Sequence, residues 1–319
     1  MTPARRRSLA SALPLLAVAM GLGLSAREAS AEDPDQAAHA ERCATRLSIA
    51  ILGESPAAAL RSSPDPQSQI GSLLVAPAFR EKLARFVNAS FNRIPGASPG
   101  EDAPYWLTLR ILEKGRPWRD LFVGPYDVVE DADGKVTVRD SADGLGYFRS
   151  GPWLRRYAGN ELAGLKISTA YRMMHNTIGL KLTAVTNEPN ADISATGRAK
   201  QPCASCHQEN YYALDKVAKV LTRKVTSDNG DVRFDPPTGG PQSILAGATI
   251  ANDKELVTAL VDSDAFKFNQ CRLAFTYLYG RVENQCEGPI FDKCMAAFTA
   301  SGTIESAIKS LATDSSFCQ

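Results

Sequence analysis

The strongest constraint on this chain is a run of five residues, Cys-Ala-Ser-Cys-His, at positions 203–207. Its two thiols, Cys203 and Cys206, are three positions apart, so each can add across one vinyl group of a haem. The histidine that follows, His207, is then carried beneath the ring, where its imidazole can bind the iron as the proximal ligand. This spacing is the attachment signature of a c-type haem. The sequence therefore predicts one covalent haem c at Cys203, Cys206 and His207.

Two other uses of these thiols fit the sequence less well. A structural zinc site takes a second pair of ligands, whereas the sequence has no second Cys-x-x-Cys run and no histidine after His207. A thioredoxin-like redox pair follows a strand in a βαβ unit, whereas residues 195–202 form a polar stretch. Haem attachment is therefore the favoured interpretation.

The N-terminus has the pattern of a secretory signal peptide. Three arginines at positions 5–7 precede an apolar stretch from Leu9 to Leu24, and residues 29–31, Ala-Ser-Ala, form a small-x-small cleavage site. The apolar stretch is short and is interrupted by proline and glycine, which disfavours a membrane span. We expect residues 1–31 to be removed and the mature protein to be periplasmic or extracellular in a bacterium.

Charge limits the partners of the mature protein. Cleavage removes four arginines and one glutamate, so 36 basic and 35 acidic residues become 32 and 34. The remaining charge of about −2 argues against nucleic acid or an anionic membrane surface as a partner. We expect a redox partner protein, whose identity the sequence leaves open, no nucleic-acid partner, and no stable membrane span after cleavage.

Apolar periodicity predicts a mainly α-helical fold with a small hairpin- or loop-rich middle segment. Helices are expected over about 40–51, 77–92, 160–182 and 214–221, and four short helices after residue 252. The Asp133-Gly134 pair, flanked by Val128-Val129 and residues 136–138, predicts a hairpin. The apolar runs at 106–112 and 120–123 are assigned to the same hairpin or long loop, and residues 227–240 to a loop.

These elements suggest four segments along the chain. Residues 1–31 are the signal peptide, 32–96 an N-terminal helical module, 97–190 a mixed middle segment of unassigned role, and 191–319 a haem-attachment and C-terminal helical module.

Two stretches resemble modules of the planctomycete-type cytochrome c proteins, which are secreted bacterial proteins. In the first, residues 46–56 with their arginine-leucine opening and Gly-x-x-Pro turn precede the leucine pair Leu73-Leu74 and Phe79. In the second, the Cys-Ala-Ser-Cys-His run at 203–207, called the haem run below, is followed in order by Leu245-Ala246-Gly247, Glu255-Leu256, Phe266, Cys271 and Tyr279-Gly280-Arg281. This resemblance implies a secreted, mainly helical haem protein and names no substrate.

The second axial ligand of the iron has several candidates. Residues 173–175, Met-Met-His, place three possible ligands in one helical turn shortly before the haem run. His175 is slightly preferred over Met174, because neutral imidazole is a strong iron ligand. His39 and Met295 rank behind them.

Five cysteines remain after haem attachment, so at least one stays unpaired or pairs between chains. We predict a disulfide between Cys286 and Cys294, which flank a Gly-Pro turn in an exported protein. Cys271 lies on an apolar helix face, so core packing competes with a bridge to Cys43 or Cys318.

Taken together, these features predict an exported single-haem c-type cytochrome that transfers electrons. Two alternatives stay open: a binding or scaffold protein in which the haem is structural, and a haem peroxidase-like enzyme. A peroxidase needs a distal acid/base group, and the chain has three histidines in all. A His-Glu-x-x-His motif and a phosphate-binding loop are missing from the sequence, and no catalytic residues are predicted.

Overall fold

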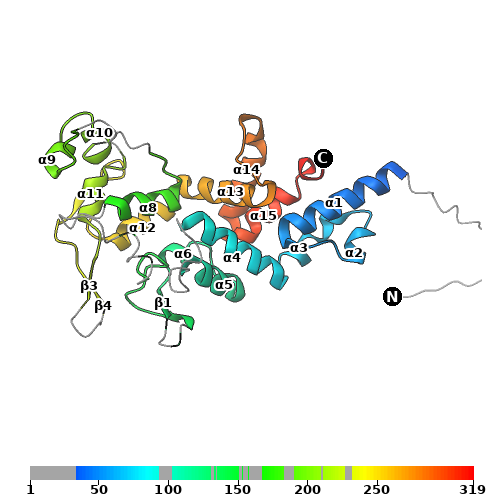
Figure 1. Cartoon of the computed structure of the whole chain (residues 1–319). Helices are drawn as coiled ribbons and strands as arrows, with labels where there is room; N and C mark the ends of the chain where they lie inside the picture. The colour runs from blue at the N-terminus through cyan, green and yellow to red at the C-terminus, as the bar shows by residue number, and fades with distance from the viewer. Residues whose placement is uncertain are drawn as a thin grey trace, which may run out of the picture.

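The computed structural model describes residues 34–92, 103–130, 133, 135–150, 153, 157, 167–182, 190–209, 211–226 and 232–319. The predicted signal peptide, residues 1–31, lies outside them. The described fold is mainly α-helical, as predicted. It is elongated, with α1 (Pro34–Leu52) at one end and α9 (Ala195–Arg198), α10 (Ala204–His207) and α11 (Leu214–Lys219) at the other (Figure 1). Across the described ranges, no helix combines the length and apolar character needed to cross a membrane.

The N-terminal helices form where apolar periodicity predicts them. Helix α1 buries Cys43, Leu47 and Ile51 at three- and four-residue spacing, and it ends at Gly53, whose φ of 78° is the left-handed conformation that favours glycine. Three short helical segments, α2 (Ala58–Arg61), η1 (Pro66–Gln69) and α3 (Ile70–Leu73), lead to α4 (Pro77–Phe91). Helix α4 begins with proline at its first position and buries one apolar face in the core.

The middle segment is more helical than predicted. The run 106–112 lies in α5 (Ala103–Lys114), and 120–123 forms α6 (Asp120–Val123), so their assignment to a hairpin or long loop is wrong. Helix α5 packs on α4 and buries Leu107, Ile111 and Leu112, which recur at helical spacing. A short, almost continuous apolar run does not separate a buried helix from a buried strand, and packing on α4 settles the choice here.

Three two-stranded antiparallel sheets occur in the described part of the chain. The predicted hairpin is confirmed: β1 (Tyr126–Glu130) pairs with β2 (Val136–Asp140), and Val128 lies opposite Val138. A second hairpin joins β3 (Arg223–Thr226) to β4 (Val232–Asp235), so the prediction of a loop over 227–240 is wrong for β4. The third joins β5 (Gln242–Ile244) to β6 (Ala248–Ile250).

The four C-terminal helices are confirmed as α12 (Asp253–Val261), α13 (Asp264–Tyr279), α14 (Gly288–Ser301) and α15 (Ile304–Ala312). Asn252 caps α12 by accepting a hydrogen bond from the Glu255 amide over 2.9 Å. Gly280 and Gly302 end α13 and α14 in the left-handed conformation, with φ of 67° and 70°. These helices share one buried apolar cluster with α1, α4, α5, α8 (Ile167–Ile178) and α11.

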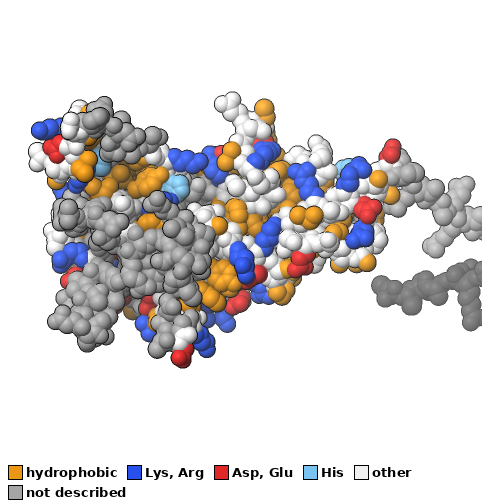
Figure 2. Space-filling view, in the orientation of Figure 1, with side chains coloured by type: hydrophobic (Ala, Val, Ile, Leu, Met, Phe, Trp, Pro, Cys, Tyr) orange, Lys and Arg blue, Asp and Glu red, His pale blue; other side chains and the backbone are white. Residues whose placement is uncertain are grey.

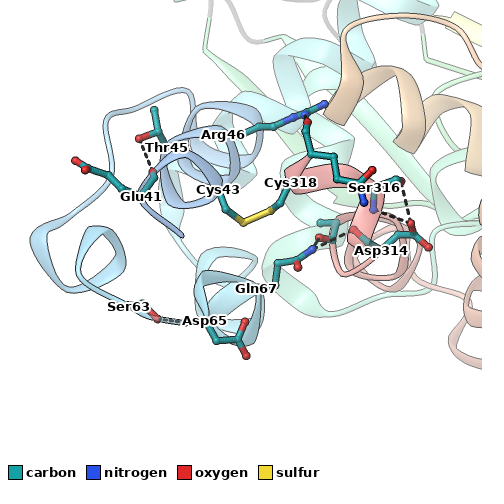
Figure 3. The surroundings of a disulfide bond; sticks show 12 residues. Glu41, Cys43, Thr45, Arg46, Ser63, Asp65, Gln67, Asp314, Ser316 and Cys318 are labelled. Carbon is teal, nitrogen blue, oxygen red and sulfur yellow. Dashed lines mark hydrogen bonds between the residues drawn. A yellow bond between two sulfur atoms is a disulfide. The ribbon is translucent and has the colours of Figure 1, made fainter. Parts of the chain in front are cut away.

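One disulfide fastens the C-terminus to the first helix. Cys318 in η4 (Ser315–Cys318) is bonded to Cys43 of α1, and Arg46 on the same helix donates to the Gln319 carbonyl over 2.8 Å (Figure 3). Gln67 of η1 donates to the carbonyls of Ala312 and Asp314 over 2.7 and 3.1 Å. These contacts join parts of two predicted segments, 32–96 and 191–319, whose boundaries stay a prediction.

The second disulfide corrects the predicted pairing. Cys294 is bonded to Cys271, and the predicted Cys286–Cys294 bond is wrong. Cys294 and Cys271 are both fully buried where α14 packs on α13, whereas Cys286 lies in η3 (Gln285–Glu287) with a free, exposed thiol. Because α14 packs on α13, Cys294 bonds to Cys271, 23 positions away, and not to Cys286, which is nearer in the sequence.

We expect the double substitution Cys271→Ala/Cys294→Ala to lower the free energy of unfolding by about 3 kcal/mol, because the disulfide closes a loop of moderate length in the unfolded chain. Urea unfolding followed by circular dichroism measures the loss. The control Cys286→Ala removes an exposed free thiol and should change nothing. Recovery of Cys286 joined to Cys294 in a non-reduced peptide map would contradict the pairing.

Candidate functional site

The haem run forms a single helical turn. Cys203 is the N-cap of α10, and its carbonyl accepts hydrogen bonds from the amides of Cys206 and His207, both over 3.1 Å. The hydroxyl of Ser205 donates to the Pro202 carbonyl over 2.8 Å and steadies the start of the turn. Residues three and four apart on a helix share a face, so the turn presents Cys203, Cys206 and His207 together. Both thiols are free and partly exposed.

The imidazole of His207 is held by a buried carboxylate. Its Nδ1 lies 2.7 Å from Oδ2 of Asp215 on α11, whose side chain is 2% exposed. Arg198 of α9 donates to the same carboxylate, from Nε over 3.2 and 3.1 Å and from Nη2 over 2.9 Å. A carboxylate held by a guanidinium accepts hydrogen bonds, so Nδ1 of His207 is the donor. In the neutral form of this ring, the lone pair that can bind a metal is therefore on Nε2.

Asp215 and Arg198 were not predicted from the sequence. One signal was present: Asp215 lies within an apolar helical pattern made by Leu214, Val217 and Val220, all of which are buried. A carboxylate on such a face needs charged or hydrogen-bonding partners once it is buried. The sequence does not say that these partners are Arg198 and His207, because that depends on how three short helices pack.

Helix α8 carries the second predicted ligand, His175. Its Nδ1 lies 2.7 Å from the Leu180 carbonyl, which the turn at Gly179 (φ 72°) brings back towards the ring. The ring is part-buried and lies 5.6 Å from that of Tyr171, centroid to centroid. Burial lowers the pKa of His175 below its ordinary value, so the imidazole is neutral near pH 7. Met174, the other candidate in this turn, has no exposed surface and packs in the core.

His207 and His175 lie on two helices that pack against the same helix, α11. Helix α11 packs against both α10, which carries His207, and α8, which carries His175. Figure 2 shows orange apolar surface in this region with pale blue histidine surface at two places along it. The Tyr212 hydroxyl lies 3.9 Å from Sγ of Cys206, and Ile193, just before α9, is 66% exposed. Among the described residues, Nε2 of neither ring has a hydrogen-bond partner.

The lower-ranked candidates lie elsewhere. His39 is exposed on α1, at the opposite end of the molecule from α10 (Figure 1). Met295 is partly buried on α14 and packs against the apolar core. Within the described ranges, no three His, Cys, Asp or Glu side chains group closely enough to hold a metal ion by themselves. The residues that fit a covalent haem are therefore Cys203, Cys206 and His207, with His175 on α8, which packs against the same helix α11 as α10 does.

No protein-family model, curated protein or solved structure matches this chain. The resemblance to planctomycete-type cytochrome c proteins therefore stays a prediction.

We expect Arg198→Gln to lower the free energy of unfolding by about 3 kcal/mol, because it leaves the Asp215 carboxylate buried without its guanidinium. Urea unfolding measures this loss, which should shrink in an Asp215→Asn background because the two side chains are coupled. The control is Arg85→Gln, which breaks an exposed pair with Glu81 and should cost almost nothing. Equal losses for the two arginine variants would contradict the role of Arg198.

Proposed function

We propose that this protein is an exported c-type cytochrome that transfers electrons through one haem attached at Cys203 and Cys206. The observation that carries the proposal is the state of His207, whose Nδ1 is bonded to a buried carboxylate while Nε2 is left for a metal. Metal-binding histidines are commonly held in this way. The same helical turn supplies two free thiols at the attachment spacing.

Three residues of the chain would attach the haem and bind its iron. The S–H of each thiol adds across one vinyl double bond: sulfur bonds one carbon and hydrogen goes to the other, so two thioethers form without net oxidation. His207 offers Nε2 to the iron, and Asp215 keeps the ring in the required tautomer and orientation. When bound, the haem supplies one-electron transfer at its iron.

His175 is the preferred ligand on the other side of the iron. Its Nδ1 is bonded to the Leu180 carbonyl, its pKa is lowered by burial, and its ring is partly exposed. Met174 lies in the core, so its sulfur would have to leave a packed site to reach a haem. With both histidines as ligands the iron would have no open position, which would favour electron transfer over peroxide chemistry. The two disulfides are compatible with an exported protein.

The intact mass of protein purified from a host that matures haem c tests the attachment. We expect the mass of the cleaved polypeptide plus one haem, and the bare polypeptide mass for Cys203→Ala/Cys206→Ala. Cys286→Ala is the matched control, because Cys286 is also a free thiol but stands outside the run. A wild-type mass without haem from that host would refute the proposal.

The visible spectrum of the oxidised protein tests the second ligand. We expect His175→Ala to change the spectrum from low-spin to high-spin, because it removes one of two strong-field imidazoles. Met174→Leu keeps the volume of the buried side chain and should leave the spectrum low-spin. The reverse pattern, with Met174→Leu high-spin and His175→Ala unchanged, would move the assignment to Met174.

A further inference from the structure

The two histidines that we assign to the iron have different hydrogen-bond partners. His175 is bonded to a neutral backbone carbonyl, that of Leu180. His207 is bonded to the carboxylate of Asp215, which is almost fully buried and also accepts from Arg198. The chain thus places a negative charge and its positive partner directly behind one ligand and not behind the other.

We propose that Asp215 is a positioning residue that lowers the reduction potential of the iron through His207, and that Arg198 limits this effect. The inference rests on the proposed function, because it concerns the ligand of the attached haem. A carboxylate accepts a stronger hydrogen bond from an imidazole N–H than a carbonyl does, and it makes the ring a more strongly donating ligand. Stronger donation stabilises the more highly charged, oxidised iron. The potential therefore falls.

Arg198 opposes this effect through the same carboxylate. Its guanidinium holds both oxygens of Asp215, so part of the negative charge is compensated within the pair. The low exposure of the pair, 16% for the Arg198 side chain and 2% for that of Asp215, reduces screening by water. Removing the carboxylate and removing the guanidinium should therefore shift the potential in opposite directions. If Asp215 and Arg198 only held the His207 ring in place, removing either side chain would free the ring, and the two variants would not shift the potential in opposite directions.

The fold supplies a matched control in a second buried pair. Arg149 donates to Asp253 of α12 from Nε over 3.2 Å and from Nη2 over 2.6 Å, and the Asp253 side chain is 6% exposed. This pair has the same chemistry and similar burial as Arg198 and Asp215, but none of the hydrogen bonds found for Asp253 involves a histidine. Asp253→Asn therefore reports what the loss of a buried carboxylate does to the protein without touching the iron ligand.

The test is a redox titration of haem-containing protein followed by the visible spectrum. We expect the midpoint potential to rise in Asp215→Asn, to fall in Arg198→Gln, and to stay at the wild-type value in Asp253→Asn. If Asp215→Asn does not mature with haem, the fall in Arg198→Gln decides the question. Shifts of the same sign in the Asp215 and Arg198 variants, or an Asp215 shift no larger than that of Asp253→Asn, would overturn the inference.

A second measurement needs no haem. In ¹⁵N-labelled Cys203→Ala/Cys206→Ala protein, NMR of the neutral imidazole should find the His207 proton on Nδ1, because Asp215 accepts it. A proton on Nε2 would overturn the inference whatever the fate of the haem. The outcomes also separate the two proposals. Wild-type protein without haem refutes the proposed function and this inference together, whereas attached haem with unchanged potentials refutes this inference alone.

Discussion

The end of the molecule that carries the Cys-Ala-Ser-Cys-His run depends on the burial of one carboxylate, that of Asp215. A carboxylate removed from water is costly unless charged and hydrogen-bonding groups surround it. Arg198 and His207 supply those groups from two other helices. Helices α9, α10 and α11 have four, four and six residues, too few to be stable in isolation. Their common contact with Asp215 is what fixes the thiols and the imidazole of α10 in one arrangement.

The rest of the fold supports this end through helix packing and two disulfides. Helix α8 packs against α11 and also against α12 and α13, so His175 is carried by a helix that joins the site to the C-terminal core. One disulfide binds α13 to α14, and another ties the last residues to α1. The proposed electron transfer would benefit from such support, because iron ligands that do not move would keep the reorganisation on oxidation small. The mixed middle segment contributes α5 and α6 to the same buried cluster.

Sequence reasoning succeeded where a local pattern determines the outcome. Helices α1 and α4 and the four C-terminal helices lie where apolar periodicity predicts them, and the β1–β2 hairpin lies where the Asp133-Gly134 pair predicts one. It failed where packing between distant segments decides. Helix α5 was missed because its apolar run is ambiguous alone, and the partner of Cys294 is set by the packing of α14 on α13. In the candidate site, the placement of Cys203, Cys206 and His207 on one helical turn follows from their spacing, whereas the hydrogen bond between Asp215 and His207 could not be predicted.

The most direct test is the crystal structure of the mature protein from a haem-maturing host, with anomalous data collected at the iron edge. The account predicts one iron bound by Nε2 of His207, thioether bonds to Cys203 and Cys206, and Nδ1 of His207 still donating to Asp215. It also predicts Nε2 of His175 as the opposite ligand. A map without iron at α10, or with Cys203 and Cys206 joined in a disulfide, would contradict the central claim.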